Sequence, residues 1–240
     1  GHQVTVYEKE DRVGGLLMYG IPSMKLEKSI IMRRVKMMEE EGVVFKTNVE
    51  VGRDITKEQL LQQYDAVVLC CGSQKARDLK VKGRQSQGIY FAVDFLKAVT
   101  KNELDQKLCP SAQGKNVVIV GGGDTGNDCV ATCIRQGCTS VTQIEMMSAP
   151  PTVNQNPWPQ WPNVLKVDYG QEESLEVFHQ DPRVYNTIIK ECLHDNGKLV
   201  GVKTSKGSFV NGKWQEKPAS EKYLKADLLL IAAGFEGVLD

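Results

Sequence analysis

The sequence lacks the features that mark several large classes of protein. Its thirty lysine and arginine residues are balanced by thirty aspartate and glutamate residues, so the formal net charge is zero. This balance gives no reason to expect a nucleic-acid partner or an anionic membrane surface. No apolar run approaches the roughly 20 residues that a membrane-spanning helix needs. We therefore expect neither nucleic acid nor membrane among the partners of the chain.

The seven cysteines and three histidines form no metal or disulfide pattern. No C-x-x-C is present, Cys70 and Cys71 are adjacent in an apolar run, and the histidines lie far apart in sequence. Zinc and iron–sulfur sites need a more regular ligand spacing, so no metal ligand is predicted. An odd number of scattered thiols is typical of a reducing compartment. We expect an intracellular, cytoplasmic location, or a plastid in a plant or alga.

A glycine-rich stretch in the middle of the chain carries the clearest functional motif. The apolar run 117–120 leads into Gly121, Gly123 and Gly126, which form G-x-G-x-x-G, and a helix-like segment follows over 127–135. The glycines permit a tight turn, a close approach of backbone to a pyrophosphate, and close packing of helix on strand. The helix N-terminus then offers free N–H groups to the anion. The stretch predicts a dinucleotide site, with a purely structural glycine turn as the alternative.

Glu145 bears on the choice of dinucleotide. It lies 19 residues beyond Gly126, which is the spacing expected of a ribose-binding acid. A carboxylate there accepts hydrogen bonds from the ribose 2′-hydroxyl and repels a 2′-phosphate. Residues 146–149 contain no basic side chain. NADH is therefore favoured over NADPH, the alternative being a solvated glutamate with the ribose contact elsewhere.

Two pairs of segments repeat each other in the same order. Residues 65–72 (DAVVLCCG) align on residues 227–234 (DLLLIAAG), and residues 1–8 (GHQVTVYE) resemble residues 137–145 (GCTSVTQIE). Each pair has the character of a strand in a nucleotide-binding unit. The chain thus holds two copies of one nucleotide-binding plan. In the first copy the matching glycine cluster would precede Gly1, so we expect the chain to be part of a longer polypeptide.

Local patterns predict several further elements. The spacing of apolar residues predicts a helix over 26–41, ended by a glycine, whereas 11–22 has the composition of a glycine-bearing loop. Residues 65–71 have the composition of a buried strand, and 199–224 that of a meander of short strands.

The two remaining stretches are irregular in composition. Residues 73–113 look like a connector with some helix at 92–100. Five prolines exclude a helix over 149–162, a loop that carries Trp158 and Trp161. Aromatic residues in such a loop cap a ligand, pack on a neighbouring protein or fill the core beneath.

Four separated segments together resemble one known family. They are 14–22 (GGLLMYGIP), 121–128 (GGGDTGND), 156–162 (NPWPQWP) and 167–170 (VDYG). All four are similar to the small (beta) subunit of glutamate synthase and to its fused eukaryotic counterpart, and the similarity spans essentially the whole chain. The resemblance implies an α/β fold with two Rossmann-like dinucleotide-binding domains. These would be a truncated FAD domain with its connector over 1–112, to which 235–240 return, and an inserted NAD(P)H domain over 113–234.

The family resemblance also implies an activity. It implies hydride transfer from NADH to FAD, with electrons passing through iron–sulfur clusters to FMN on the synthase portion, where glutamine and 2-oxoglutarate become two glutamates. The partner would be the large (alpha) subunit or a fused synthase region. Cofactors carry this chemistry, so no catalytic acid or base is predicted, and Glu10, Asp11, Glu172 and Glu173 are expected to be solvated charges.

The resemblance assigns cofactor contacts residue by residue. In the first copy, Glu8 would bind the adenosine ribose of FAD, Gly14 and Gly15 would approach its pyrophosphate or ribityl chain, and Val51 would meet the adenine. Gly72 would close the FAD-side strand. The isoalloxazine would lie near Tyr19, Gly20, Ile21 and Pro22.

In the second copy, the resemblance implies that one set of residues holds the NADH pyrophosphate, with Glu145 on the ribose. This set is Gly121, Gly123, Asp124, Thr125 and Gly126. Gly234 and Phe235 would lie near the nicotinamide or at the hinge between the domains.

Three parts of the family pattern are missing from these residues. They are the first FAD glycine cluster, the cluster-binding cysteines of the N-terminal region, and the C-terminal segment of the flavin site. We therefore expect the chain alone to bind FAD poorly or not at all, and to lack the iron–sulfur clusters and FMN. Three alternatives stay open: a pyrimidine dehydrogenase-like or ferredoxin reductase-like flavoprotein, a disulfide reductase, which would need a cysteine pair near the flavin, and a non-catalytic nucleotide-binding module.

Overall fold

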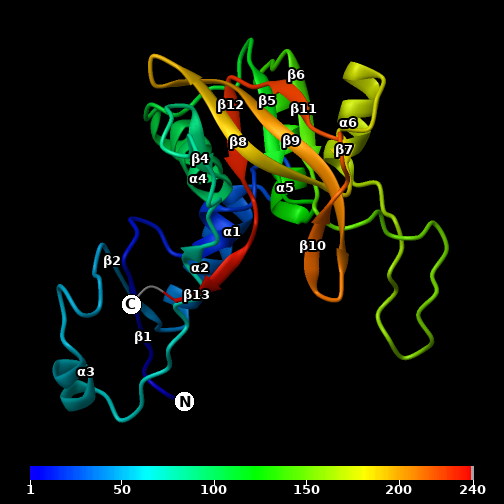
Figure 1. Ribbon diagram of the computed structural model, residues 1–240. Helices are drawn as coiled ribbons and strands as arrows, with labels where there is room; N and C mark the ends of the chain where they lie inside the picture. Colours follow the sequence, from blue (N-terminus) through cyan, green and yellow to red (C-terminus); the bar gives the residue numbers. More distant parts are fainter. Residues whose placement is uncertain (239–240) are drawn as a thin grey trace.

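A five-stranded parallel sheet forms the centre of the computed structural model, which describes residues 1–238. The strand order is β4-β12-β5-β6-β7 (Figure 1). The strands are β4 (Ile89–Phe91), β12 (Leu228–Ile231), β5 (Asn116–Val120), β6 (Ser140–Ile144) and β7 (Arg183–Val184). The central strands are buried on both faces, which explains why they consist of nearly continuous apolar residues. The predicted α/β fold is confirmed.

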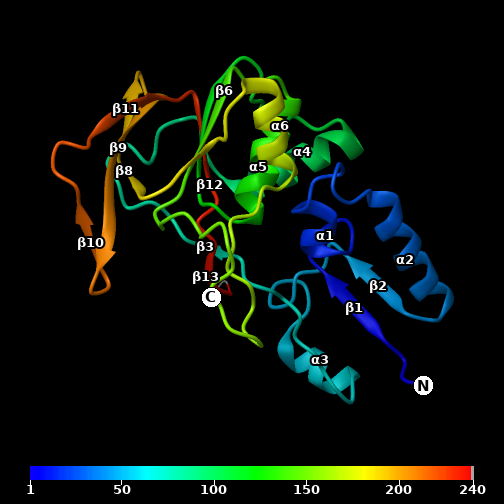
Figure 2. The same ribbon diagram turned by 90° about the vertical axis from the view of Figure 1, so that its right-hand side faces the viewer.

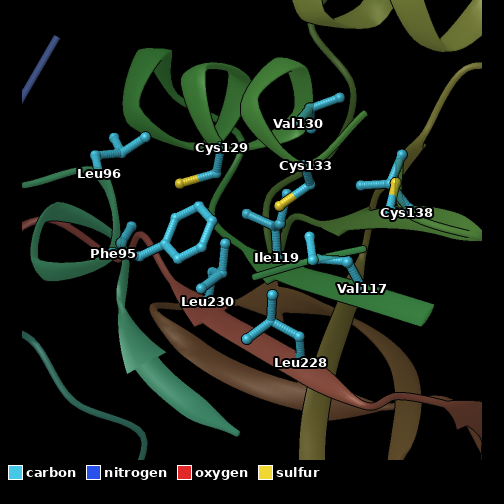
Figure 3. Close-up of a cluster of buried hydrophobic side chains, with 13 residues drawn as sticks. Phe95, Leu96, Val117, Ile119, Cys129, Val130, Cys133, Cys138, Leu228 and Leu230 are labelled. Carbon is cyan, nitrogen blue, oxygen red and sulfur yellow. The ribbon is translucent and has the colours of Figure 1, made fainter. Parts of the chain in front are cut away.

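Helices cover one face of this sheet. They are α4 (Ala92–Asp105), α5 (Asp124–Arg135) and α6 (Tyr169–Phe178). Phe95 of α4 and Cys129 of α5 pack with Val117, Ile119 and Leu230 in a fully buried cluster (Figure 3). Side chains of a strand alternate between its two faces, so Val117 and Ile119, which are two positions apart on β5, point to the same face. Leu230 of β12 points to this face as well. Burial of such side chains stabilises the fold by roughly 1.5–3 kcal/mol each.

An antiparallel sheet covers the opposite face. It comprises β8 (Thr187–Asp195), β9 (Lys198–Val210), β10 (Lys213–Glu216) and β11 (Lys222–Lys225). Cys192 and Val202 pack there against Val118, Leu229 and Ile231, which point away from the helices. Figure 2 shows the resulting three layers, with the antiparallel sheet on one side and the helices on the other. The predicted strands over 199–224 are confirmed as β9 to β11, but the predicted meander order is wrong, because β11 pairs with β9 and not with β10.

The first copy forms a smaller unit beside α4 and α5 (Figure 1). Its two parallel strands are β1 (Thr5–Glu8) and β2 (Val44–Thr47). Its helices are α1 (Gly15–Tyr19), α2 (Lys28–Glu40) and α3 (Lys57–Gln63). The predicted helix over 26–41 is confirmed as α2. The prediction that 11–22 is entirely a loop is wrong, because α1 forms within it, beginning at glycines that adopt positive φ.

The prediction of a buried strand at 65–71 is also wrong. Residues 66–71 are extended but belong to no strand, and Val68 and Leu69 are about four-fifths exposed. An extended segment becomes a strand only when a neighbouring strand supplies hydrogen bonds to its backbone. No strand of residues 1–238 pairs with this segment.

The stretch 73–113 is more regular than a connector. Besides β4 and α4 it contains β3 (Lys75–Ala76), which pairs antiparallel with β13 (Phe235–Gly237). Because β4 pairs with β12, the five-stranded sheet extends into the range that we expected to lie outside the inserted domain. Of the segment expected to return to the first domain, residues 239–240 lie outside the described residues.

Candidate functional site: the glycine turn after β5

The turn after β5 has no space for a side chain at two of its glycines. Gly121 has a φ of +118°, and a Cβ placed there would lie 2.2 Å from the carbonyl oxygen of Ala232. At Gly126 a Cβ would lie 2.3 Å from the carbonyl oxygen of Gly121. These two glycines therefore bring the end of β12 and the start of α5 against the turn. Gly121 also donates its N–H to the carbonyl of Ile144 at 2.8 Å, which ties the turn to β6.

The helix α5 points its N-terminus at this turn. Gly123 is its N-cap residue and Asp124 is its first helical residue, followed by Thr125 and Gly126. The first N–H groups of a helix have no partner within the helix, and the helix dipole adds positive potential there. This arrangement fits an anionic pyrophosphate, as the sequence motif predicts.

Glu145 lies at the same turn, directly after β6. Its Oε2 accepts a hydrogen bond from the N–H of Gly122 at 2.7 Å, and its Oε1 accepts one from the N–H of Met147 at 2.8 Å. The two bonds fix the carboxylate at the carboxyl end of the sheet, where ligands of this fold class bind. The structure thus brings Glu145 together with the glycines, as its spacing predicts.

A buried glutamine pair beneath the turn was missed by the sequence reasoning. Gln143 of β6 is fully buried and donates from Nε2 to the carbonyl of Gly121 at 2.8 Å. Gln171 of α6 donates to Oε1 of Gln143 at 3.2 Å. A buried amide costs free energy unless it is hydrogen-bonded, so this pair fixes the turn relative to α6. The available signal was a polar residue inside an otherwise apolar strand.

The first copy repeats part of this geometry. Glu8 ends β1 as Glu145 follows β6, and its Oε1 accepts a hydrogen bond from the N–H of Glu10 at 2.9 Å. In both copies the carboxylate therefore binds the N–H of the residue two positions later. This shared contact supports the repeat that the sequence predicts.

The proposed flavin-side segment is a compact turn around α1. Gly14 and Gly15 have φ values of +118° and +52°, and a Cβ at Gly20 would require the side chain of Leu16 to move, because Leu16 Cδ2 lies 2.7 Å from its position. The buried ammonium of Lys28 donates to the carbonyl of Leu17 at 3.0 Å and to that of Ile21. Burial lowers the pKa of Lys28. The sequence reasoning missed this lysine, which fixes the backbone of the segment.

The flavin-side segment is linked to the second copy through Lys25, which lies just after it in the chain. Pro22 accepts hydrogen bonds at its carbonyl from the N–H groups of Lys25 and Leu26. Lys25 in turn forms an ion pair with Asp128 of α5 at 3.2 Å. Asp128 also accepts a hydrogen bond from the hydroxyl of Tyr169 at 2.5 Å. The turn around α1 is therefore connected directly to the helix that begins at the glycine turn.

The expectation that Glu10 and Asp11 are solvated charges is wrong. Glu10 forms ion pairs with Lys97 and, at 3.2 Å, with Lys101 of α4, while Asp11 accepts a hydrogen bond from the hydroxyl of Tyr19 at 2.6 Å. Burial raises the pKa of Asp11, but the hydrogen bonds from Tyr19 and Lys101 outweigh it and hold the pKa at about 2.

A bidentate pair completes this contact between the copies. Arg12 donates to both carboxylate oxygens of Asp105 at 2.6 and 3.0 Å. Such forked pairs are geometrically specific. The two copies are thereby held in one relative orientation.

Glu172 and Glu173 differ in their surroundings, since Glu173 pairs with Arg135 at 2.7 Å, whereas Glu172 lies exposed in the first turn of α6.

The remaining predicted site residues lie outside these contacts. Val51 is half exposed and forms a single bridge to Ile55, and Gly72 is exposed with a φ of +64°. Gly234 follows β12, and its carbonyl accepts the N–H of Arg77 at 2.9 Å. Phe235 pairs with Ala76 in the short sheet of β3 and β13, where the two segments that link the copies meet.

The thiols separate into two groups. Cys70, Cys71 and Cys109 are exposed or partly exposed, and the other four are buried. Burial raises the pKa of all four buried thiols, to about 11 for Cys138 and Cys192. No cluster of three or more metal-ligating side chains occurs in residues 1–238, and no helix in that range is long and apolar enough to cross a membrane.

The chain is similar to one protein family over nearly its whole length. A family model described as pyridine nucleotide-disulphide oxidoreductase matches residues 1–239. The chain is 45% identical over 248 residues to glutamate synthase [NADH] of Saccharomyces cerevisiae, covering 99% of this chain and 12% of that protein. It is 47% identical over 249 residues to the glutamate synthase [NADPH] small chain of Bacillus subtilis, covering 99% of this chain and 50% of that protein. The predicted resemblance is confirmed.

Solved structures with the same fold agree. Mycobacterium tuberculosis FprA in complex with NADPH matches with a TM-score of 0.73 at 19% identity, over 98% of this chain and 64% of that chain. T. acidophilum thioredoxin reductase matches with a TM-score of 0.57 at 18% identity, over 97% of this chain and 69% of that chain. At these identities the likeness shows the fold alone. With the family model matching residues 1–239, the chain belongs to the pyridine nucleotide-disulphide oxidoreductase family.

Proposed function

We propose that the chain is the electron-input portion of a glutamate synthase. In this role the second copy binds NADH, the first copy contributes to an FAD site, and electrons pass onward through iron–sulfur clusters and FMN to the synthesis of glutamate from glutamine and 2-oxoglutarate. The chain spans about half of the Bacillus subtilis small chain and about an eighth of the yeast enzyme. The complete activity therefore belongs to the longer polypeptide or assembly.

One observation carries the nucleotide part of the proposal. The carboxylate of Glu145 is fixed on the glycine turn by Gly122 and Met147, at the carboxyl end of the parallel sheet. Gly123, at the N-cap of α5, has no protein atom within 4 Å of the place where a Cβ would lie, so its backbone is open to a pyrophosphate. These groups fit a dinucleotide, because the helix N–H groups donate to the phosphates and the carboxylate accepts from the ribose hydroxyls.

The same carboxylate supports NADH over NADPH. A 2′-phosphate at Glu145 would place two negative charges within a few ångströms, which is unfavourable at any effective dielectric constant. Residues 146–149 offer no arginine or lysine to compensate. The names of the relatives include both NADH and NADPH enzymes, so the preference rests on Glu145.

The work of the protein in this reaction is to bind and orient. The bound cofactors supply the hydride chemistry. We propose that Gly121, Gly123, Asp124, Thr125 and Gly126 hold the pyrophosphate of NADH. Gly234 and Phe235 then lie at the hinge between the inserted NAD(P)H domain, proposed over 113–234 and joined by β4 and α4, and the first domain. Alignment of the two cofactors is the main contribution that a scaffold of this kind makes.

For FAD, the first copy offers only part of a site. We propose that Glu8 binds the ribose, Gly14 and Gly15 approach the pyrophosphate, Val51 the adenine, and Gly72 closes the strand, with Tyr19, Gly20, Ile21 and Pro22 beside the isoalloxazine. Gly14 and Gly15 have the positive φ values of a close-approach turn. The extended segment 65–72 is exposed, which supports the proposal that further polypeptide completes this site.

The partner and compartment follow from the same proposal. The partner is a glutamate synthase large subunit or a fused synthase region, and the compartment is the cytoplasm or a plastid. All seven cysteines are unpaired, which is consistent with a reducing environment.

Calorimetric titration with NADH and NADPH tests the nucleotide part. The unmodified chain is expected to bind NADH more tightly than NADPH, and Glu145→Arg is expected to weaken NADH at least tenfold while improving NADPH. Glu8→Arg is the matched control, because it makes the same change at the equivalent residue of the first copy and should leave NADH binding unchanged. Equal binding of both nucleotides, unaffected by Glu145→Arg, would contradict the assignment. Circular dichroism of each variant confirms that it is folded.

A further inference from the structure

The loop 149–165, here called the tryptophan loop, presents two bare indole rings to solvent. Trp158 and Trp161 are 93% and 83% exposed, and Val153 is 72% exposed. The loop extends away from the rest of the molecule (Figure 1). Core filling, one of the roles expected for these aromatics, is therefore wrong. Large aromatic residues gain their stabilisation by burial, so exposed ones on one loop mark an interaction surface.

The tryptophan loop is held in shape by its own hydrogen bonds. Its base is closed by the N–H of Leu165 donating to the carbonyl of Pro151 at 2.7 Å. Further along, Asn154 Oδ1 accepts the N–H groups of Asn156 and Asn163, each at 3.2 Å. Asn156 Nδ2 donates to the carbonyl of Trp161 at 2.6 Å. Five prolines restrict the backbone further, so little entropy is lost when the loop binds a partner.

The tryptophan loop and the three residues before it carry no charge. Residues 146–165 contain none of the sixty acidic and basic residues of the chain. The cores of protein interfaces are depleted of charge, and their binding energy is concentrated in residues such as tryptophan. An uncharged, preorganised loop with two tryptophans fits an apolar pocket on a macromolecule.

We propose that the tryptophan loop is a docking element for the synthase polypeptide, inserting Trp158 and Trp161 into an apolar pocket of the large subunit or fused synthase region. This inference rests on the proposed function. The module occurs in relatives both within a small chain and as 12% of a much longer chain, so at least the former needs a non-covalent contact.

The position of the loop favours this occupant over the remainder of the same small chain. Gly1 and β13, at the two ends of the described chain, lie beside the first copy, whereas the tryptophan loop projects on the far side of the molecule (Figure 1). Polypeptide that continues from either end therefore begins at the first copy, where segment 65–72 is exposed. The tryptophan loop lies away from both of these points (Figure 1).

Photo-crosslinking in the complete enzyme tests the proposal. Trp158, and separately Trp161, is replaced by benzoylphenylalanine in the full polypeptide, the assembly is irradiated, and the linked peptides are identified by mass spectrometry. Crosslinks to the synthase chain or region are expected. The control places the same probe at Leu108, which is fully exposed on a different loop and should give no synthase crosslink.

A second measurement gives the energetic effect. Trp158→Ala with Trp161→Ala is expected to weaken association with the synthase polypeptide at least tenfold, whereas Leu108→Ala leaves it unchanged. Where the two parts are fused, the readout is protection of the loop from hydroxyl-radical oxidation. NADH affinity of the double variant should equal that of the unmodified enzyme, so a failure here is distinct from a failure of the NADH proposal.

Several outcomes would overturn the docking proposal. Crosslinks to the nucleotide face of the same chain, together with a loss of NADH affinity, would make the loop a lid over the cofactor. Crosslinks to a second copy of the chain would make it an oligomer contact, and crosslinks to the rest of the small chain would make it internal. An unprotected loop in the complete enzyme, with association unchanged in the double variant, would also overturn it.

Discussion

The two copies of the nucleotide-binding plan have similar sequences but different structures. In the second copy, β12 pairs with β5 on one side and β4 on the other, and Leu228 to Ile231 are all buried. In the first copy, the equivalent residues 66–71 are exposed and unpaired within residues 1–238. An apolar run therefore forms a strand only where neighbouring strands pair with its backbone and other elements cover its side chains.

A single carboxylate makes the difference visible at atomic scale. Asp227 accepts hydrogen bonds from the N–H of Asn116 at 2.9 Å and from its Nδ2 at 2.7 Å, which joins the start of β12 to the start of β5. Asp65 is the equivalent residue and is exposed. The aspartate that begins each repeat therefore binds a neighbouring strand only in the second copy, where such a strand is present.

Hydrogen exchange should show the largest contrast between the copies. Backbone amides of β12 are expected to exchange at least about a thousandfold more slowly than those of 66–71, because the former open only with the whole sheet and the latter are already open. Exchange detected by mass spectrometry on the chain checks this. Equal protection of the two segments would show that 66–71 forms a strand in solution.

Substitution of one positive-φ glycine in each copy should separate the copies next. Gly121→Ala is expected to lower the free energy of unfolding by about 3 kcal/mol and to abolish NADH binding, because a Cβ would lie 2.2 Å from the carbonyl oxygen of Ala232 at a φ of +118°. Gly72→Ala should cost only about 1 kcal/mol, since its φ of +64° is strained for alanine but no atom lies near. Urea unfolding of both variants measures the two effects.

The paired acids allow a sharper comparison. Asp227→Ala is expected to lower the free energy of unfolding by about 1–2 kcal/mol, because it leaves the amide groups of Asn116 without their acceptor. Asp65→Ala should change it by less than about 0.5 kcal/mol, as is usual for an exposed residue. Thermal or urea denaturation under the same conditions tests the pair. A similar loss in both variants would mean that Asp65 has a partner of its own.

The contact between the copies should depend on pH through Asp11. Its pKa lies at about 2, below the ordinary 3.8, so its contribution to stability is present above about pH 3.8 and is lost as the pH falls through 2. Because the side chain is partly solvated, Asp11→Asn is expected to cost only about 1 kcal/mol at pH 6. The difference from the unmodified chain should shrink as the pH falls below 4. Urea unfolding at pH 6, 4 and 3 measures this, and a constant difference would show that the carboxylate charge is not involved.

The second copy was predicted well because its signals are local. Gly121, Gly126 and Glu145 are linked by short spacings along one strand-turn-helix-strand unit, and the structure brings them to one turn. The contacts of Gln143, Lys28 and Glu10 could not be predicted from spacing. Their partners are Gln171 on α6, the carbonyls of Leu17 and Ile21, and lysines of α4, most of which come from other elements of the fold.

The sequence by itself determined the α/β class, the repeat, the glycine turn and the position of its acid, because strand periodicity and glycine conformation are properties of neighbouring residues. Only the tertiary structure decided which apolar runs are buried and which charges are paired. Residues 66–71 and 228–231 have the same local character, yet only the latter have a strand on either side. Burial and pairing depend on elements distant in sequence, and that information is not contained in a local pattern.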